Sequence, residues 1–289
     1  MIATMNTTSD PVLAVAVRAA RRAASVIIDA SRDLRRLPTF SKEHGDIVAA
    51  ADSEAESAIA ATISAAFPEH AILTEDSGEV KAGNPESPFR WIVDPIDGSL
   101  NFVHGFPYFA VSVALAKGDQ ITHAVILDPA HDELFTAIRD KGAQRNGAPM
   151  RVSTCTRLAD ALVGTVFPTR KSPMLASYLP VFAALAEQCA GLRRAGACAL
   201  DLAHLASGRL DGFWVTSLRA WDVAAGSLLV NEAGGRVGDF AGGTEFLRTN
   251  EVIAAAPGLF NPLREAIVAA LPASSVASQP TSGRGSATT

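Results

Sequence analysis

The sequence predicts an α+β protein, because helical and extended patterns alternate in blocks along its 289 residues. Two helical patterns come first, strand patterns follow, and the second half returns to helices around a short strand. A chain of this length can bury a large core, as one domain or as two fused halves. We expect a single domain over residues 9–272, with an antiparallel sheet in its first half (9–150) and an α/β second half (151–272).

The N-terminal block predicts two helices. The first starts at Pro11, a favourable first helical position after Asp10, and has apolar residues at helical spacing on one face. The second is expected to start at a capping box at residues 53–56 and to end at Pro68, which cannot continue a helix. The apolar residues of the first helix are Leu13, Val17, Ala20, Ala24 and Ile28.

The next block predicts strands. A buried strand is expected at 90–93, ending near Asp94 because Pro95 cannot continue a central ladder. Asn146-Gly147 is a strong hairpin turn. Between them, an antiparallel meander is expected at 110–117, 121–127 and 133–138.

The second half predicts further elements, of which the last ends at Gly234, a residue that suits a left-handed helix cap. Residues 234–238 follow a helix, so they are interpreted as that cap and not as a dinucleotide loop, which follows a strand. Residues 273–289 are rich in Ser, Thr, Gly and Pro and are expected to be disordered. The expected elements are helices at 174–189 and 197–206, a short strand near Phe213, and a helix from Trp221.

The composition agrees with an ordinary soluble enzyme, and we expect it in the cytoplasm. A net charge of −5 and a pI near 5.7 argue against nucleic-acid binding driven by charge. The apolar stretch 12–28 is interrupted by arginines, so we expect neither a signal sequence nor a membrane span. The cysteines lack metal-ligand spacing and are expected to be reduced thiols. They are Cys155, Cys189 and Cys198.

Four acidic side chains are concentrated around one short turn, with Asp94 and Asp97 within it and Glu75 and Asp76 upstream. Carboxylates this close repel each other in a medium of reduced dielectric, so a fold retains them when a cation offsets the repulsion. Hard oxygen ligands, with the Ile96 carbonyl between the two aspartates, suit Mg²⁺ better than zinc. The sequence therefore predicts a divalent metal site.

Two neighbouring features extend this site. Gly98 permits a tight turn, after which the amides of Ser99 and Leu100 begin a short helix and can bind phosphate. Asp222 falls in the first turn of the helix that opens at Trp221. Its position leaves two interpretations open, a metal ligand or an acid that only complements the helix dipole.

These residues resemble the motifs of the inositol monophosphatase family. The resemblance is carried by residues 94–102, by Glu75-Asp76 before them, and by 221–226 and 232–235 after them. Order and spacing match from about Pro11 to Leu271, and motifs this long are specific. Segments 192–203 and 208–214 are most similar to the bacterial SuhB-type branch. The resemblance implies a layered αβαβα sandwich of the inositol monophosphatase and sugar phosphatase type, with the site between the two halves.

The resemblance also implies a metal-ligand set and a reaction. It places one Mg²⁺ on Glu75, Asp94 and the Ile96 carbonyl, and a second on Asp94, Asp97 and Asp222. Two or three ions per site are expected. Cations roughly 3.5–4 Å apart can clamp both the attacking and the leaving oxygen of a phosphoryl displacement. Metal-activated water is then expected to attack the phosphate directly, without a phosphoenzyme.

Asp52 and Ser99 join Glu75 as the expected catalytic residues. By resemblance, the Asp52 carboxylate pairs with the Ser99 hydroxyl, which replaces the usual Thr, and the pair orients the nucleophilic water. Taken without the resemblance, Asp52 is an acid at a helix start. Asp76 receives no ligand role and is expected to be a supporting or surface acid.

The implied substrate contacts come from both halves of the chain. At Val215, family members selective for inositol phosphates usually have a Glu that contacts the ring hydroxyls, and at Ala197 a Ser or Thr is common. The departure at Val215 argues against sharp inositol selectivity. Arg193 and Arg194 are candidates for attracting an anionic substrate, or are structural charges. The implied contacts are Asp97, Gly98, Ser99, Gly196, Ala197, Cys198, Val215 and Asp222.

The expected function is a Mg²⁺-dependent phosphomonoesterase acting on inositol 1-phosphate or a similar small polyol, sugar or nucleotide monophosphate. One alternative is a phosphatase with another main substrate, such as histidinol phosphate or a nucleoside 2′- or 3′-phosphate. Another is a SuhB-like binding factor in transcription antitermination and ribosomal-RNA maturation, acting through a protein contact. The resemblance further implies a homodimer and sensitivity to Li⁺, and the arginines within residues 12–28 lead us to expect no membrane association.

Overall fold

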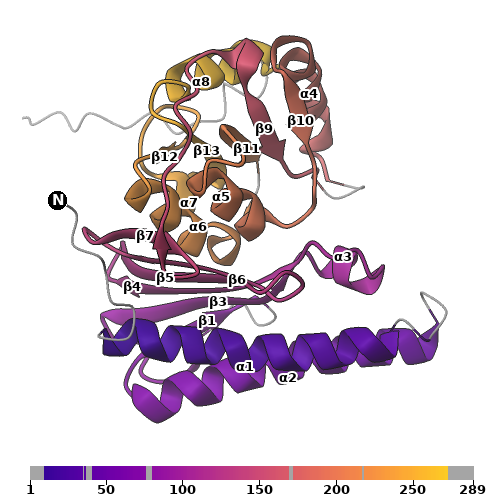
Figure 1. Cartoon of the computed structure of the whole chain (residues 1–289), viewed down its shortest axis with the longest axis vertical. Coiled ribbons are helices and arrows are strands. Elements are labelled where there is room, and N and C mark those ends of the chain that lie inside the picture. Colours follow the sequence, from indigo (N-terminus) through magenta and orange to yellow (C-terminus); the bar gives the residue numbers. More distant parts are fainter. Residues whose placement is uncertain are drawn as a thin grey trace, which may run out of the picture.

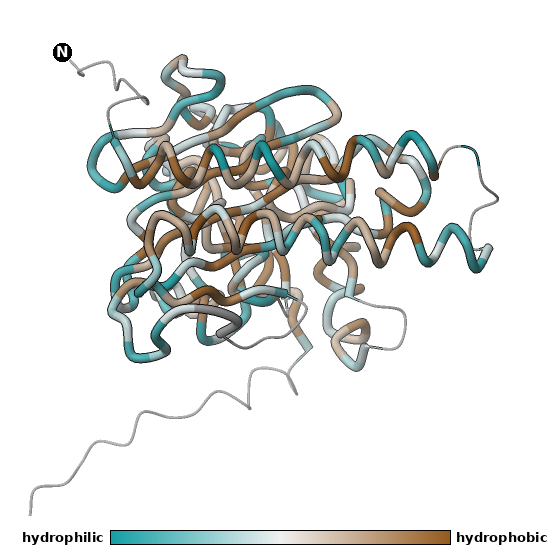
Figure 2. Tube along the Cα trace, turned by 90° about the horizontal axis from the view of Figure 1, so that it is seen from below, coloured by the Kyte–Doolittle hydropathy of each residue, from teal (hydrophilic) through white to brown (hydrophobic). Residues whose placement is uncertain are grey.

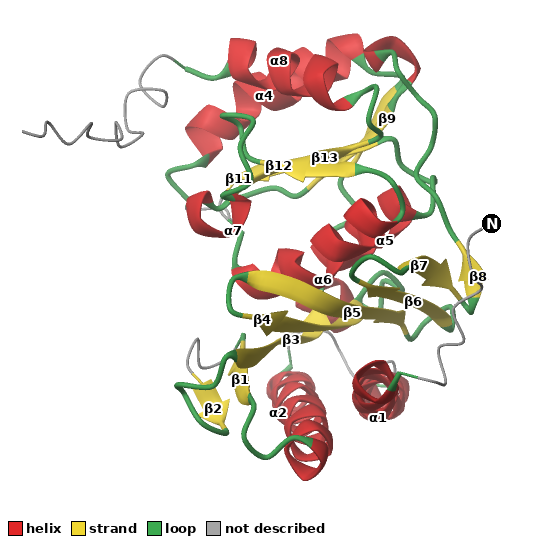
Figure 3. Ribbon diagram, turned by 90° about the vertical axis from the view of Figure 1, so that its left-hand side faces the viewer, coloured by secondary structure: helices red, strands yellow, loops and turns green. Residues whose placement is uncertain are grey.

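The computed structural model of the chain describes residues 10–34, 36, 41–75, 80–168, 172–216 and 218–272. Its elements form five layers, seen edge-on in Figures 1 and 3: a helix pair, a sheet, a second helix pair, a second sheet and a third helix pair. This is the αβαβα sandwich that the resemblance implied.

The described helices are α1 (Pro11–Leu34), α2 (Lys42–Ala66), α3 (Ser99–Val103), α4 (Leu175–Gln188), α5 (Cys198–Ala206), α6 (Ala220–Glu232), α7 (Phe246–Thr249) and α8 (Phe260–Ala270), with a 3-10 turn at Leu158–Asp160. The first sheet contains β1 (Ala71–Thr74), β2 (Val80–Ala82), β3 (Phe89–Asp97), β4 (Ala110–Lys117), β5 (Gln120–Asp128), β6 (Glu133–Ile138), β7 (Gly142–Arg145) and β8 (Ala148–Pro149). The second contains β9 (Leu162–Thr165), β10 (Gly191–Arg193), β11 (Gly212–Thr216), β12 (Arg236–Gly238) and β13 (Glu251–Ala255).

The first sheet has the strand order β2-β1-β3-β4-β5-β6-β7-β8, and the expected meander is confirmed as β4, β5 and β6. The expectation of a purely antiparallel sheet is wrong at one pair, because β1 runs parallel to β3. The chain returns through β2 before it enters β3, which permits this parallel neighbour. The second sheet has the order β10-β9-β11-β13-β12 and combines parallel and antiparallel pairs.

Apolar residues from both faces of each sheet form the cores between the layers. In β3, Trp91 and Val93 pack with α1 and α2, whereas Ile92 faces the opposite side, where α5 and α6 lie. Trp214 of β11 packs on the far side of the second sheet with α4 and α8. Brown and teal alternate along the two long helices in Figure 2, as expected for helices with one buried face. No helix within the described ranges combines the length and apolar character needed to cross a membrane.

The N-terminal helices differ in one respect from the sequence prediction. The start of α1 is confirmed, because Asp10 Oδ1 accepts the N–H groups of Val12 and Leu13 at 3.0 Å. The predicted start of the second helix at 53–56 is wrong: α2 begins at Lys42, and the Ser41 hydroxyl caps it by accepting the His44 N–H at 3.1 Å. The capping-box residues therefore lie inside a helix whose first turns are already packed.

The second half confirms the expected elements as α4, α5, β11 and α6. Gly234 follows α6 with φ +87°, the left-handed conformation expected of the cap. Sequence patterns did not identify β9, β10, β12, β13, α7 or α8, most of which are short. The segment expected to be disordered, 273–289, lies outside the described residues.

The central helix layer depends on one close contact. Gly226 of α6 faces Leu202 of α5, and a Cβ added to Gly226 would lie 2.4–3.0 Å from three Leu202 side-chain carbons. Both residues are buried between the two sheets. A side chain at position 226 would therefore push α5 and α6 apart.

We expect Gly226→Ala to lower the free energy of unfolding by about 1–3 kcal/mol, the usual cost of overpacking a filled core. Urea unfolding followed by circular dichroism measures this change. The matched control is Gly45→Ala in α2, where an added Cβ meets nothing within 4 Å. That substitution should stabilise the protein by about 0.5–1 kcal/mol. Equal effects of the two substitutions would contradict the packing argument.

Candidate active site

A bulge in β3 turns Asp94 and Asp97 toward the same face of the first sheet. Asp94 pairs with Ser112 of β4 and Asp97 pairs with Ala110, so residues 95–96 occupy the space of one partner residue. Without the extra residue, side chains three positions apart would face opposite sides. The prediction that the strand ends near Asp94 is therefore wrong, because the ladder pauses at the proline and resumes at Asp97.

Two further acids reach this point from other elements. Glu75 directly follows β1, which lies parallel to β3, and its side chain is hydrogen-bonded to Asp94. Asp222 lies in the first turn of α6, where its carboxylate accepts the Arg219 N–H at 2.8 Å. One carboxylate oxygen from each of Asp94, Asp97 and Asp222 lies within 4.8 Å of the others. Asp222 therefore fits both interpretations left open by the sequence.

Burial and mutual repulsion raise the pKa values of these acids. Asp94 is 1 % exposed, and burial raises its pKa well above the ordinary value, with the charges of Asp97, Glu75 and Asp222 adding to the effect. Burial also raises the pKa of Asp97, as does the charge of Asp222. Burial raises the pKa of Asp222 to about 6. At neutral pH the cluster is held in an electrostatically unfavourable state.

The donor chemistry of the cluster fits a hard divalent cation. Its side chains offer only carboxylate oxygens, which Mg²⁺ prefers over softer ligands. The Ile96 N–H donates to Asp94 Oδ1 at 3.0 Å, which fixes the orientation of that carboxylate at the bulge. The ligand role of the Ile96 carbonyl stays a prediction, and Asp76 lies outside the described residues.

The predicted phosphate-binding turn at Gly98 lies against the turn at Gly196, which carries predicted substrate contacts. Gly98 has φ +88° and Gly196 has φ +98°, conformations that favour glycine. A Cβ added to Gly98 would lie 3.0 Å from the Ala197 Cβ and 3.2 Å from the Gly196 carbonyl oxygen. The structure thus brings Gly98 and Ser99 of the first half beside residues 196–198 of the second.

Asp97 joins these two turns directly. Its carboxylate oxygens accept the N–H groups of Cys198 at 3.1 Å and Ala199 at 2.7 Å, the first amides of α5. These charge-assisted bonds hold the acid between β3 and α5. Asp97 therefore connects the acidic cluster to the turn at residues 196–198.

Val215 is buried between the sheets, whereas Arg193 is exposed and Arg194 lies over an aromatic ring. Val215 is 1 % exposed and packs in the apolar cluster between the sheets, so its contact with substrate stays a prediction. Arg193 ends β10 and is exposed. The Arg194 guanidinium lies 5.4 Å from the centre of the Phe167 ring, where cation–π attraction holds it.

Asp52 and Ser99 line one cavity of about 380 Å³ between α2 and the start of α3. Asp52 is half-buried in the middle of α2, and not at a helix start as its sequence position suggested. Ile96 also lines this cavity, which therefore lies next to the acidic cluster. The placement is compatible with the expected pair, whose catalytic role stays a prediction.

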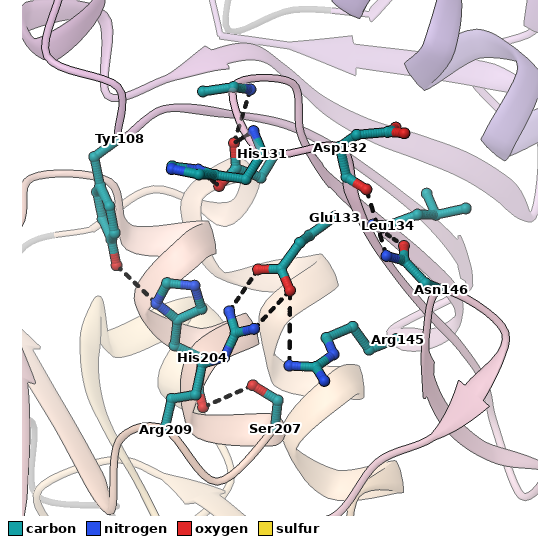
Figure 4. A network of polar contacts seen from close by, with 12 residues as sticks. Tyr108, His131, Asp132, Glu133, Leu134, Arg145, Asn146, His204, Ser207 and Arg209 are labelled. Carbon is teal, nitrogen blue, oxygen red and sulfur yellow. Dashed lines mark hydrogen bonds and ion pairs between the residues drawn. The ribbon is translucent and has the colours of Figure 1, made fainter.

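Sequence reasoning missed a polar group behind the site. The Tyr108 hydroxyl donates to Asp201 Oδ1 at 2.6 Å and lies 3.3 Å from His204 Nδ1, a contact drawn in Figure 4. Asp201 is fully buried, and burial raises its pKa to about 7. Nearby, Arg209 and Arg145 contact Glu133, an arrangement that joins the turn after α5 to β6. In the sequence, the signal for this group was Asp201, an acid in the first turn of the apolar helix α5.

The five-layer fold and the carboxylate cluster on the inner face of its first sheet, together with the match to solved inositol monophosphatases, place the chain in the class of magnesium-dependent phosphatases. The sequence profile of the inositol monophosphatase family matches residues 8–274. The chain belongs to this family, and within it to the branch of the bacterial SuhB proteins.

The most similar relatives agree with this assignment. The Nus factor SuhB of Pseudomonas aeruginosa is 44% identical over 269 residues, covering 91% of this chain and 98% of the relative. The structure of the extragenic suppressor protein suhB from Bartonella henselae has a TM-score of 0.80 at 39% identity, covering 90% of this chain and 100% of that one. The inositol monophosphatase of Anabaena (Nostoc) sp. PCC 7120 has a TM-score of 0.79 at 35% identity, covering 91% and 97%.

The metal-free protein should lose stability as the pH rises from about 4 to about 6. The pKa of Asp222 rises from 3.8 to about 6 on folding, so the folded state binds this proton more tightly than the unfolded state. The resulting stability is present below the unfolded pKa and is lost as the pH rises through the folded pKa. Thermal unfolding in EDTA across this range measures the loss.

Asp222→Asn should flatten this pH dependence, whereas Asp119→Asn, at an exposed turn, should leave it unchanged. Mg²⁺ should raise the unfolding temperature more at pH 8 than at pH 5, because it binds the deprotonated carboxylates. A stability of the metal-free protein that rises between pH 4 and 6 would refute the argument.

Proposed function

We propose that this chain hydrolyses inositol 1-phosphate and similar small polyol, sugar or nucleotide monophosphates. The observation that carries the proposal is the cluster of the buried Asp94 and Asp97 with the half-buried Asp222, with Glu75 hydrogen-bonded at its edge. Carboxylates with raised pKa values favour a functional site, and oxygen ligands of this kind suit a divalent cation. The finer substrate assignment rests on family membership together with the residues around this cluster.

Glu75, Asp94, the Ile96 carbonyl, Asp97 and Asp222 would hold two or three Mg²⁺ ions. Bound there, Mg²⁺ supplies the positive charge that neutralises phosphate oxygens and acidifies water. Asp94 is the deepest of these acids and lies against both Asp97 and Glu75. It is therefore the residue suited to contribute to more than one ion.

The remaining site residues position the phosphate ester and the water. The turn at Gly98-Ser99 presents backbone amides to the phosphate, and residues 196–198 close the opposite side. Asp52, through the Ser99 hydroxyl, would orient the attacking water and accept its proton. No step requires a side chain to become phosphorylated.

The residue at position 215 argues for a broad substrate range. Val215 offers no hydrogen bond to a ring hydroxyl, and a site that lacks such a contact discriminates weakly between polyols. Histidinol phosphate and nucleoside 2′- or 3′-phosphates are therefore alternative main substrates.

A binding role is the second candidate. The relatives from Pseudomonas aeruginosa and from Escherichia coli, 44% and 41% identical, are Nus factors by name. By analogy, this chain would contact the transcription machinery through a protein surface, since its charge of −5 disfavours direct RNA binding. We also propose, on family grounds, a cytoplasmic homodimer that Li⁺ inhibits by competing with Mg²⁺.

Asp94→Asn should abolish phosphate release, with a loss of at least about 10³-fold in kcat/KM, because it removes the shared ligand. Wild-type protein with Mg²⁺ should hydrolyse inositol 1-phosphate, 2′-AMP, glycerol 2-phosphate and histidinol phosphate with kcat/KM values within about tenfold of each other. Assays of phosphate release measure the loss in the variant and the kcat/KM values of the wild type. The proposal fails if none of the four substrates is hydrolysed.

The same variant separates the two candidate functions in cells. If a chromosomal Asp94→Asn change removes hydrolysis but leaves growth and ribosomal-RNA processing as in the wild type, the cellular role is the binding one. Parallel loss of both favours the phosphatase.

Asp52→Asn and Ser99→Ala should each lower kcat by about 10²–10⁴-fold, the range for loss of a positioned general base. Because the two residues act as one unit, the double variant should be no slower than the slower single variant. Ser99→Thr is the matched control and should retain activity, since it keeps the hydroxyl. Additive losses would show that the residues act separately.

A further inference from the structure

Three chain segments meet at the side-chain amide of Asn101 in α3. Its Nδ2 donates to the Tyr108 carbonyl oxygen at 2.7 Å and to the Ala195 carbonyl oxygen at 2.9 Å. Tyr108 lies in the loop between α3 and β4, and Ala195 in the loop between β10 and α5. The amide therefore joins Asn101, in the first half of the chain, to Ala195, which lies 94 positions later in the second half.

The space around this link is filled. A Cβ added to Gly196 would lie 3.1 Å from Asn101 Nδ2, and one added to Gly98 would lie 3.0 Å from the Tyr108 carbonyl oxygen. The turns at Gly98 and Gly196 are thus so close to the groups that Asn101 connects that neither position has room for a side chain. Neither turn can shift without breaking an Asn101 hydrogen bond or creating an overlap.

The Tyr108 end of the link is itself anchored to α5. Its hydroxyl donates to the buried Asp201 at 2.6 Å and contacts His204 at 3.3 Å, as Figure 4 shows for the histidine. The segment containing α3 is therefore attached to α5 at two places. One attachment runs through the Asp97 carboxylate and the amides at the start of α5, the other through Asn101 and Tyr108.

The chemistry of this link is specific to an amide. Both acceptors are carbonyl oxygens, so the linking group must supply two N–H donors from one atom. An aspartate of the same shape has none and would place an oxygen against two others. A serine is too short to bridge both carbonyls and removes the link without adding a charge.

We propose that Asn101 is a positioning residue that sets the Gly98-Ser99 turn against the turn at 196–198, so that both face the same phosphate. The inference rests on the proposed phosphatase function, in which these turns hold the phosphate. It differs from that function in its prediction for binding: loss of the link should weaken phosphate binding while the carboxylates still bind Mg²⁺.

The test compares Asn101→Asp and Asn101→Ser with the wild type by thermal unfolding and by kinetics. Mg²⁺ alone should raise the unfolding temperature of every protein. Inorganic phosphate added with Mg²⁺ should raise it further in the wild type but not in the two variants. Turnover should fall by about tenfold to a hundredfold in both, as for a displaced reacting group, with a raised KM.

The matched control is Asn146→Asp. Asn146 also links separate segments through its side chain, accepting the Leu134 N–H at 2.8 Å and approaching the Asp132 carbonyl oxygen at 3.4 Å, but it lies in the β7–β8 turn. This variant should keep the phosphate response and the turnover of the wild type.

Two results would overturn the inference. The first is a phosphate response and turnover within about twofold of the wild type in both Asn101 variants, well below the loss expected from misplacement. The second is loss of the Mg²⁺ and phosphate responses together, which would indicate a general structural role. If the wild type binds phosphate through Asn101 but hydrolyses none of the four substrates, the proposed function fails and the positioning role stands.

Discussion

The irregular ladder between β3 and β4 is the constraint on which the site depends. One extra residue in β3 places Asp94 and Asp97 on the same face of a sheet, where a regular strand would separate them. The face in question is covered by α5 and α6, so both acids are buried. The fold thus creates a concentration of negative charge in a place where water screens it only weakly.

Backbone N–H groups donate hydrogen bonds to the three aspartates and offset part of this repulsion. Asp97 is held by two amides of α5, Asp94 by one amide of its own strand, and Asp222 by one at the start of α6. Each bond favours the charged form of its acid, whereas burial opposes it. The protein fixes the direction of every carboxylate but leaves the net repulsion unresolved, which is the condition in which a cation binds with the least rearrangement.

The sequence predicted Asp94 and Asp97 as members of an acidic cluster from their spacing, and the resemblance to the family implied Asp222 as a further member and the layered fold. It did not predict the parallel position of β1, the continuation of β3 beyond Pro95, or the start of α2 at Lys42. These features depend on which strands pair in the sheet and on which of two possible residues caps the start of α2. A capping box at 53–56 satisfies every local rule, yet Ser41 caps the helix because residues before the box already pack in it. Asn101 was visible in a motif, but one of its two acceptors, the Ala195 carbonyl oxygen, lies 94 residues away in the sequence.

The close approach of Gly226 to Leu202 also bears on how the chain folds. The helices that meet there fill the space between the sheets, and the apolar cluster they form includes residues of β3, β4 and β5 as well as β11 and β13. Residues 9–150 alone would contain a complete first sheet with one of its apolar faces open to water. During synthesis, this face can be covered completely only after residue 232, where α6 ends, has left the ribosome.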